Sequence, residues 1–237
     1  TYSSGVSAAH PAVPSGFDPP RHTAYRRVVE RYFEPADVAA LEPRFRAVAT
    51  QLVASLPREE SFDIVDRFAM TYALAVQRAW LQWPQYAESA LRSWVARSQR
   101  ATRAARPEQL SAAAGDFDRT IRRVISDRRG DATQSDSDVT SRLLSERVNG
   151  VPLGDDEIVS ILRNWTAGEL GTMSAAIGIL VGYLADNPEL QQRLRRAPED
   201  LPKAIDEILR MDAPLLTNRR VTTAEVELSG QRIPAGE

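Results

Sequence analysis

The sequence predicts a mainly α-helical protein with a small β element near its C-terminal end. Over most of the 237 residues, apolar side chains recur three and four positions apart, which is the spacing of one face of an α-helix. Prolines interrupt this spacing, as they do at helix ends. Only after Pro214 does the period change to two, the spacing of a β-strand. We therefore expect a single domain, residues 1–237, with a helical core.

The N-terminal half is expected to contain a loop followed by five helices. Residues 1–20 hold four prolines among Ser, Gly and Ala, which is loop composition. The helices predicted after this loop are 22–33, 35–56, 62–82, 86–103 and 107–129. The third is apolar around most of its circumference, so we expect it to be buried, whereas the last two are rich in arginine and are expected to be more exposed.

The C-terminal half is expected to contain a polar loop, four helices and a hairpin. Residues 130–138 form the loop, and Asn149-Gly150 ends the short helix that follows it. The predicted helices are 139–148, 155–185, 188–197 and 201–211, the second of them capped by Asp155. Alternating apolar residues around Ser229-Gly230 predict a β-hairpin. Because an isolated hairpin is marginal in water, we expect the chain to end within a larger sheet.

Composition excludes several classes of function. The 30 basic and 32 acidic residues give a net charge of -2, so no field of one sign attracts nucleic acid or an anionic membrane. The apolar stretch 175–185 is shorter than the roughly 20 residues that cross a bilayer, so we expect a buried helix and not a membrane span. No signal-like segment opens the chain and no cysteine is present, so we expect a cytoplasmic protein without disulfides.

The absence of cysteine also limits catalysis and metal binding. Thiolate nucleophiles and thiolate-bound metals are impossible within these residues. Two histidines, His10 and His22, are too few for an all-histidine metal site. Neither lies near a Gly-x-Ser-x-Gly segment, so hydrolase chemistry is set aside.

The first candidate site lies in DPPRHTAYRR, Asp18 to Arg27. His22 and Arg26 are four residues apart at a helix start, so both side chains project from one face and can donate hydrogen bonds to an anion. A capped helix start with surface charge explains the same spacing. Spacing by itself leaves both interpretations open.

The second candidate site is NWTAGELGTMSAAIG, at the centre of the longest predicted helix. Ala167, Gly168 and Gly171 remove bulk along one side, although each glycine weakens a helix by roughly 1 kcal/mol relative to alanine. A tight helix crossing or a flat cofactor would account for this. Glu169 and Thr172 add an acid and a hydroxyl to a segment that we expect to be buried, which makes them catalytic candidates.

The third candidate is DEILR, in which Glu207 and Arg210 are three residues apart on a helix and can pair. An exposed pair of this kind contributes little to stability. However, Glu207 is the only glutamate in the chain that is followed by an arginine three positions later. After this pair, Arg219 and Arg220 lead into the predicted hairpin.

In this order and spacing, the three segments resemble the cytochrome P-450 family over essentially the whole chain. DPPRHTAYRR is similar to the start of the family's helix C, where His and Arg hold a haem propionate; the matching residues are His22 and Arg26. TAGELGT resembles the centre of helix I, across the distal face of the haem. The resemblance implies that Ala167 and Gly168 flank the oxygen-binding groove and that Gly171 helps to make room for the porphyrin.

The resemblance continues to the C-terminal end. Glu207-x-x-Arg210 resembles the helix K motif that holds the core below the proximal side, and Arg220 matches the arginine that contacts the other propionate. The implied fold is the mainly α cytochrome P-450 fold from before helix C to just after helix K, with part of a small β-sheet, incomplete at both ends. Helices 86–103 and 107–129 would be the lid helices F and G.

The resemblance implies a soluble, bacterial-type haem-thiolate monooxygenase, with haem b as cofactor and no nucleic-acid or membrane partner. The haem iron, activated by two electrons and two protons, would insert one atom of O2 into a small hydrophobic or aromatic substrate, by hydroxylation or oxidative dealkylation. Electrons would come from NAD(P)H through a ferredoxin or flavoprotein-type donor. The axial cysteine is expected beyond residue 237, so no metal ligand lies in this chain and the 237 residues by themselves are not expected to catalyse.

One departure from the family pattern concerns proton delivery. Helix I of the family usually carries an acid followed by a threonine, and alignment on Ala167 and Gly168 places Leu170 and Gly171 there. We expect the adjacent Glu169 and Thr172, or ordered water, to carry the protons.

Two alternative functions remain. A catalytically silent relative could bind a ligand or partner with the same fold, which the altered helix I favours. An unrelated helical ligand-binding or regulatory domain is the other, although a C-terminal hairpin has no place in a pure helix bundle.

Overall fold

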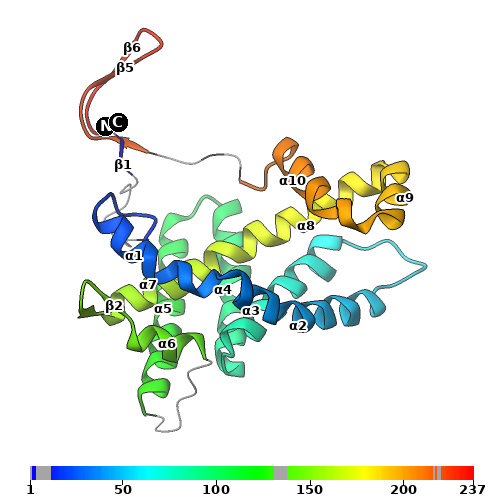
Figure 1. The fold of residues 1–237 in the computed structure, drawn as a ribbon, viewed down its shortest axis with the longest axis horizontal. Helices are drawn as coiled ribbons and strands as arrows, with labels where there is room; N and C mark the ends of the chain where they lie inside the picture. The colour runs from blue at the N-terminus through cyan, green and yellow to red at the C-terminus, as the bar shows by residue number, and fades with distance from the viewer. Residues whose placement is uncertain (1, 4–11, 131–137, 216, 218–219) are drawn as a thin grey trace. The chain divides into compact units, whose positions relative to one another are not determined.

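The computed structural model describes residues 2–3, 12–130, 138–215, 217 and 220–237, which include His22 but not His10 or Arg219. The described chain is mainly helical, as predicted (Figure 1). It is divided into two compact units. Unit 1 comprises Thr1–Glu42, Trp80–Ala167 and Asn218–Glu237, and unit 2 comprises Pro43–Ala79 and Gly168–Thr217. The expectation of a single domain stays a prediction.

The helices match the predicted ones to within a few residues in most cases. The α-helices are α1 Arg21–Glu30, α2 Pro35–Ala54, α3 Met70–Leu81, α4 Gln85–Arg103, α5 Pro107–Gly130, α6 Val139–Ser145, α7 Asp155–Arg163, α8 Glu169–Asp186, α9 Pro188–Arg196 and α10 Leu201–Met211. Two π-helical turns, Val65–Ala69 and Asn164–Gly168, precede α3 and α8. Two 3-10 turns, Arg31–Phe33 and Pro198–Asp200, follow α1 and α9. The π-helical turns were not predicted.

The predicted C-terminal hairpin is confirmed. Strands β5 Val226–Leu228 and β6 Gln231–Ile233 pair antiparallel around Ser229 and Gly230. Both turn residues have positive φ, 50° and 78°, as a tight hairpin turn requires.

A second hairpin replaces part of a predicted helix. The helix expected over 139–148 ends at Ser145, and β2 Arg147–Val148 then pairs with β3 Val151–Pro152. Asn149 and Gly150 both have positive φ. An Asn-Gly pair favours a hairpin turn, so treating it only as a helix stop was wrong.

The N-terminal segment also differs from its prediction. Residues 1–20 were expected to be loop throughout, but Tyr2–Ser3 form β1, which pairs antiparallel with β4, Val221–Thr222. A strand of two residues is too short to show the alternation of apolar and polar residues that predicts a strand. It forms only because β4 provides its hydrogen-bonding partner.

The core of unit 1 forms where α5 contacts α4 and α7. Helix α5 is more exposed than the segment 62–82, as expected, but one of its faces is buried, with buried residues three and four positions apart: Ala113, Phe117, Ile121, Val124 and Ile125. The expectation was based on the arginine content of the helix, and the arginines lie on its other faces. On α7, Arg163 donates hydrogen bonds to both carboxylate oxygens of Asp118 on α5, at 2.7 and 2.6 Å. The two side chains are 15% and 17% exposed, so this pair is largely shielded from water.

In unit 2, α8 contacts the π-helical turn Val65–Ala69 and α10. The closest approach is at Gly178, where an added Cβ would lie 2.9 Å from Cγ2 of Val65. The prediction that residues 175–185 are buried was wrong: all of them are described, and they are half-buried or exposed. The helical stretch Asp155–Asp186 has the length and hydropathy to cross a membrane, so the argument from the short stretch 175–185 does not hold. Core helices of soluble proteins share these properties.

Gly178 should tolerate a side chain less well than Gly182 on the same helix. Gly178→Ala forces the stiff Val65 side chain to move, and such overpacking costs about 1–3 kcal/mol in free energy of unfolding, more than the roughly 1 kcal/mol gained in helix propensity. A Cβ at Gly182 meets open space, so Gly182→Ala should stabilise the protein. Denaturant unfolding measures both, and equal stabilities would contradict the crossing.

Stability should decline at alkaline pH, partly through Tyr86 on α4. Burial, together with a hydrogen bond to Asp127 at 2.6 Å, raises the pKa of Tyr86 to about 12. The unfolded chain loses this proton near the ordinary pKa of about 10, so the contribution is fully present below that pH and is lost as the pH rises to about 12. Tyr86→Phe should therefore flatten the pH dependence of unfolding over this window. An unchanged slope would show that Tyr86 does not contribute.

Candidate functional site

The π-helical turn Asn164–Gly168 lies between α7 and α8. A π-turn widens the helix by one residue, and such turns are frequent at functional sites. Thr166 is fully buried, and its hydroxyl donates to the carbonyl oxygen of Leu162 at 2.7 Å. Trp165 is 8% exposed. One side of the turn is therefore anchored in the core of unit 1.

The other side of this helix is open at Gly168 and Gly171. Apart from the helix's own nearby backbone, no heavy atom of the described residues lies within 4 Å of a Cβ added at either glycine. A tight helix crossing therefore does not explain these two glycines; the crossing is at Gly178 instead. Ala167 next to them is half-buried. The small residues leave space that a planar group could fill.

The candidate proton-carrying residues differ in their surroundings. Glu169 is exposed, so the expectation of a buried acid was wrong, and its carboxylate can exchange protons with water. Thr172 is half-buried, and its hydroxyl donates to the carbonyl oxygen of Gly168 at 2.9 Å. Leu170 is fully buried and points away from solvent. The fully buried position in the first turn of α8 therefore holds an apolar side chain and not an acid.

Helix α1 carries the first pair of candidate anion ligands. His22 is half-buried and Arg26 is exposed. The Nε of Arg26 donates to Oε1 of Glu30 at 2.8 Å, one turn further along the helix. An anion that binds Arg26 must therefore compete with the carboxylate of Glu30.

Arg220 precedes β4, and strand pairing relates that strand to the start of α1. Val221 pairs with Ser3 of β1. The hydroxyl of Ser3 donates to Oδ2 of Asp18 at 2.5 Å, and the carbonyl oxygen of Asp18 accepts from the backbone N–H of His22 at 2.9 Å. Short contacts thus connect the segments that carry Arg220 and His22 within unit 1.

Aromatic residues hold the far end of α1. Trp165 packs against Tyr32, Phe33 and Trp80, with ring centroids 5.2–5.4 Å apart. Such pairs add to the stabilisation from apolar burial. Burial raises the pKa of Tyr32, whose hydroxyl donates to Glu146 at 3.3 Å. This cluster was not predicted, although the aromatic residues at positions 32, 33, 80 and 165 were its visible signal in the sequence.

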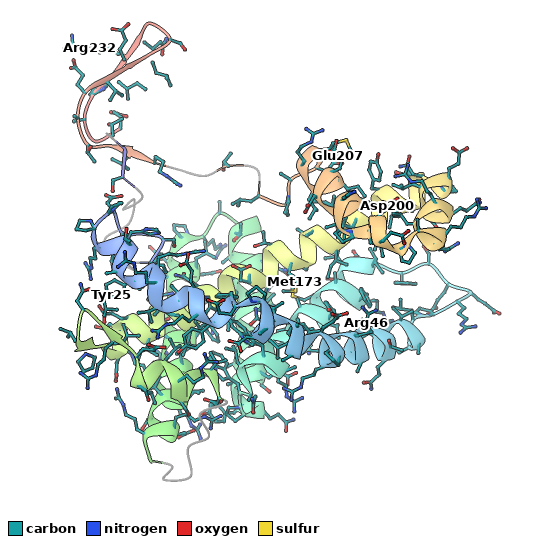
Figure 2. The ribbon with its side chains drawn as sticks, in the orientation of Figure 1. Tyr25, Arg46, Met173, Asp200, Glu207 and Arg232 are labelled. Carbon is teal, nitrogen blue, oxygen red and sulfur yellow. The ribbon has the colours of Figure 1, made fainter. Side chains whose placement is uncertain are left out.

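The predicted pair on α10 is confirmed as a contact. Arg210 donates from Nε and Nη2 to the two carboxylate oxygens of Glu207, both at 2.7 Å (Glu207 is labelled in Figure 2). The hydrogen bond from Arg210 lowers the pKa of Glu207. Both side chains are exposed among the described residues, 68% for Arg210 and 57% for Glu207, so the pair contributes little to stability here.

Comparison with known proteins identifies similar chains. The family model described as "Cytochrome P450" matches residues 107–237, more than half of the chain. Cytochrome P450 CYP107DY1 of Priestia megaterium is 28% identical over 93% of this chain and 53% of its own length. The 6-deoxyerythronolide B hydroxylase of Saccharopolyspora erythraea is 30% identical over 92% of this chain and 53% of its own length.

Solved structures agree with these matches. A mutant of P450 EryK in complex with erythromycin B superposes with a TM-score of 0.85 and 26% identity, covering all of this chain and 62% of that one. The mainly helical fold predicted from the sequence is therefore confirmed. The chain spans about half the length of the curated relatives that it matches.

Proposed function

Because the chain belongs to the cytochrome P450 family, we propose that the protein is a haem-dependent monooxygenase that inserts one oxygen atom into a small organic substrate. The observation that carries this proposal is the open side of the helix at Gly168, the last residue of the π-helical turn, and at Gly171 in α8. The name of the hydroxylase relative supports oxygen insertion as the reaction. Family membership implies haem b, O2 and electrons from NAD(P)H through a redox partner.

Each unit contains residues whose chemistry suits haem. In unit 2, the open helix face at Gly168 and Gly171 suits a flat macrocycle. In unit 1, His22, Arg26 and Arg220 have hydrogen-bond donors that suit its carboxylates. The 237 residues contain no cysteine, so they do not provide the thiolate that the proposal requires. When bound, haem would supply the redox and oxygen-activating chemistry.

The chain's own contribution is to orient groups and move protons. The hydroxyl of Thr172 donates to the carbonyl oxygen of Gly168, which leaves its oxygen lone pairs able to accept a hydrogen bond from a water and so to position that water. Glu169, one turn earlier and exposed, can take protons from solvent and replenish that water. We assign the proton path to these two residues because Leu170 and Gly171 stand where the family pattern has an acid and a threonine.

The proposal also covers the partners. A ferredoxin or flavoprotein-type donor would supply the electrons, in a cytoplasmic setting. Helices α4 and α5 would form a lid over a hydrophobic or aromatic substrate, and hydroxylation or oxidative dealkylation would be the reaction. Glu207 and Arg210 would stabilise the core on the opposite side of the cofactor.

Carbon monoxide difference spectroscopy on the haem-loaded full-length protein tests the proposal. We expect the red-shifted band of the reduced complex that thiolate-ligated haem gives. A protein that binds no haem, or a spectrum typical of histidine ligation, would reject the monooxygenase.

Thr172→Ala should uncouple oxygen consumption from product formation. Removing the hydroxyl interrupts proton transfer, so hydrogen peroxide release per electron pair should rise several-fold while haem content stays the same. Thr172→Ser keeps the hydroxyl and serves as the control. Unchanged coupling in the alanine variant would exclude Thr172 from the proton path.

A catalytically silent relative is the second candidate. The observation that favours it is Leu170, fully buried at the position where the family pattern has an acid. Such a protein would give the same carbon monoxide spectrum but would form no oxygenated product with any electron donor.

A further inference from the structure

Three polar side chains form a stripe along α7 and the residue that follows it: Glu157, Ser160 and Asn164. Their spacing of three and four residues places them on one side of the helix. All three make contacts with residues that are more than 130 positions away in the sequence. Those contacts all fall on the segment Val13–Tyr25, which contains His22.

At one end of this segment, both backbone groups of Val13 bind the stripe. The N–H of Val13 donates to Oγ of Ser160 at 2.9 Å, and Nδ2 of Asn164 donates to the carbonyl oxygen of Val13 at 3.1 Å. Val13 and Ser160 are each 2% exposed. Because a buried backbone group without a partner is costly, these two side chains determine where this part of the chain can lie.

At the other end, the hydroxyl of Tyr25 donates to Oε1 of Glu157 (Tyr25 is labelled on α1 in Figure 2). The second oxygen of Glu157 accepts from the backbone N–H of Gly154 at 2.9 Å, so the same carboxylate also caps α7. Burial and the Glu157 contact raise the pKa of Tyr25, which keeps its hydroxyl protonated as a donor. The Cζ of Arg21 lies 3.7 Å from the ring centroid of Phe17, so these two residues of the segment also contact each other.

Helix α1 itself contributes no fully buried apolar side chain at this end. Within α1, all of which the structure describes, the buried residues are Val28 and Val29, close to its C-terminal end. No side-chain hydrogen bond caps its N-terminus. The polar stripe, together with the buried Val13, therefore locates the segment that carries His22.

We propose that Glu157, Ser160 and Asn164 are positioning residues that hold His22 in place for the cofactor's carboxylates. The proposal rests on the proposed function, because it takes haem as the group that His22 binds. It adds that α7, which leads into the helix proposed to cross the distal face of the haem, also sets the position of His22 on α1.

The test compares Ser160→Ala and Tyr25→Phe with a matched control. Each variant removes one hydroxyl from the contacts of the stripe and leaves His22 intact. The control is Thr140→Val, which removes another buried hydroxyl of unit 1, the acceptor of Trp83 Nε1 at 3.1 Å, away from the stripe. All three variants should lower the free energy of unfolding to a similar extent. A difference in haem loss between the control and the other two variants is therefore not explained by general destabilisation.

Two measurements are made on each protein. In the haem-loaded full-length protein, the rate of haem transfer to an apoglobin acceptor should rise roughly tenfold in Ser160→Ala and Tyr25→Phe and remain at the wild-type value in Thr140→Val. In the haem-free protein, amide exchange in peptides covering residues 12–30 should accelerate in the same two variants.

The outcomes separate the two proposals. If the wild-type protein holds haem but the stripe variants release it no faster than Thr140→Val, the positioning role is wrong and the proposed function stands. A wild-type protein that binds no haem overturns the proposed function, and the inference with it.

Discussion

The arrangement of unit 1 depends on how α7 is held on its opposite sides. Its apolar face, which includes Ile158 and Leu162, is fully buried, and Arg163 forms an ion pair with Asp118 of α5. Its polar stripe is occupied by the chain that leads into α1. Because both sides are engaged, the π-helical turn that follows α7 begins from a fixed position. A loosely held helix would not keep the residues after it in a defined orientation.

The π-helical turn changes what the continuing helix presents. Trp165 and Thr166 stay buried, whereas Gly168, Glu169 and Gly171 are exposed among the described residues. Glycines at such positions cost helix stability, and the structure gives them no packing role, unlike Gly178. The loss of helix stability at Gly168 and Gly171 has a reason if a large planar ligand occupies the space beside them.

Most of the fold followed from local patterns in the sequence. Helices such as α10, with bounds Leu201–Met211, were predicted because apolar spacing and flanking prolines both act over a few residues. The hairpin around Ser229 and Gly230 was predicted for the same reason. The pairing of Tyr2–Ser3 with Val221–Thr222 was not, because it joins residues more than 200 positions apart whose own sequences carry no strand signal.

The sequence predicted which residue types make up the candidate site better than it predicted their burial and neighbours. The small residues at 167, 168 and 171 indicated a close neighbour, but only the structure distinguished the open side from the crossing at Gly178. The burial of Glu169 was inferred from its apolar neighbours, and it was wrong because the helix turns this residue outward. The contacts of Ser160 and Asn164 with Val13 could not be predicted, since a serine or asparagine on a helix gives no sign of a distant partner.

The connection between α4 and α5 has a mechanical consequence. Only residues 104–106 join the two helices, and Ala105 turns the chain with a positive φ of 50°. The guanidinium of Arg97 binds Asp116 across the pair at 2.5 Å, and Trp94 packs on Phe117. The short connection, this ion pair and the ring contact all oppose sliding of one helix along the other. We therefore expect α4 and α5 to move together, by rotation of the pair and not by displacement of one helix along the other.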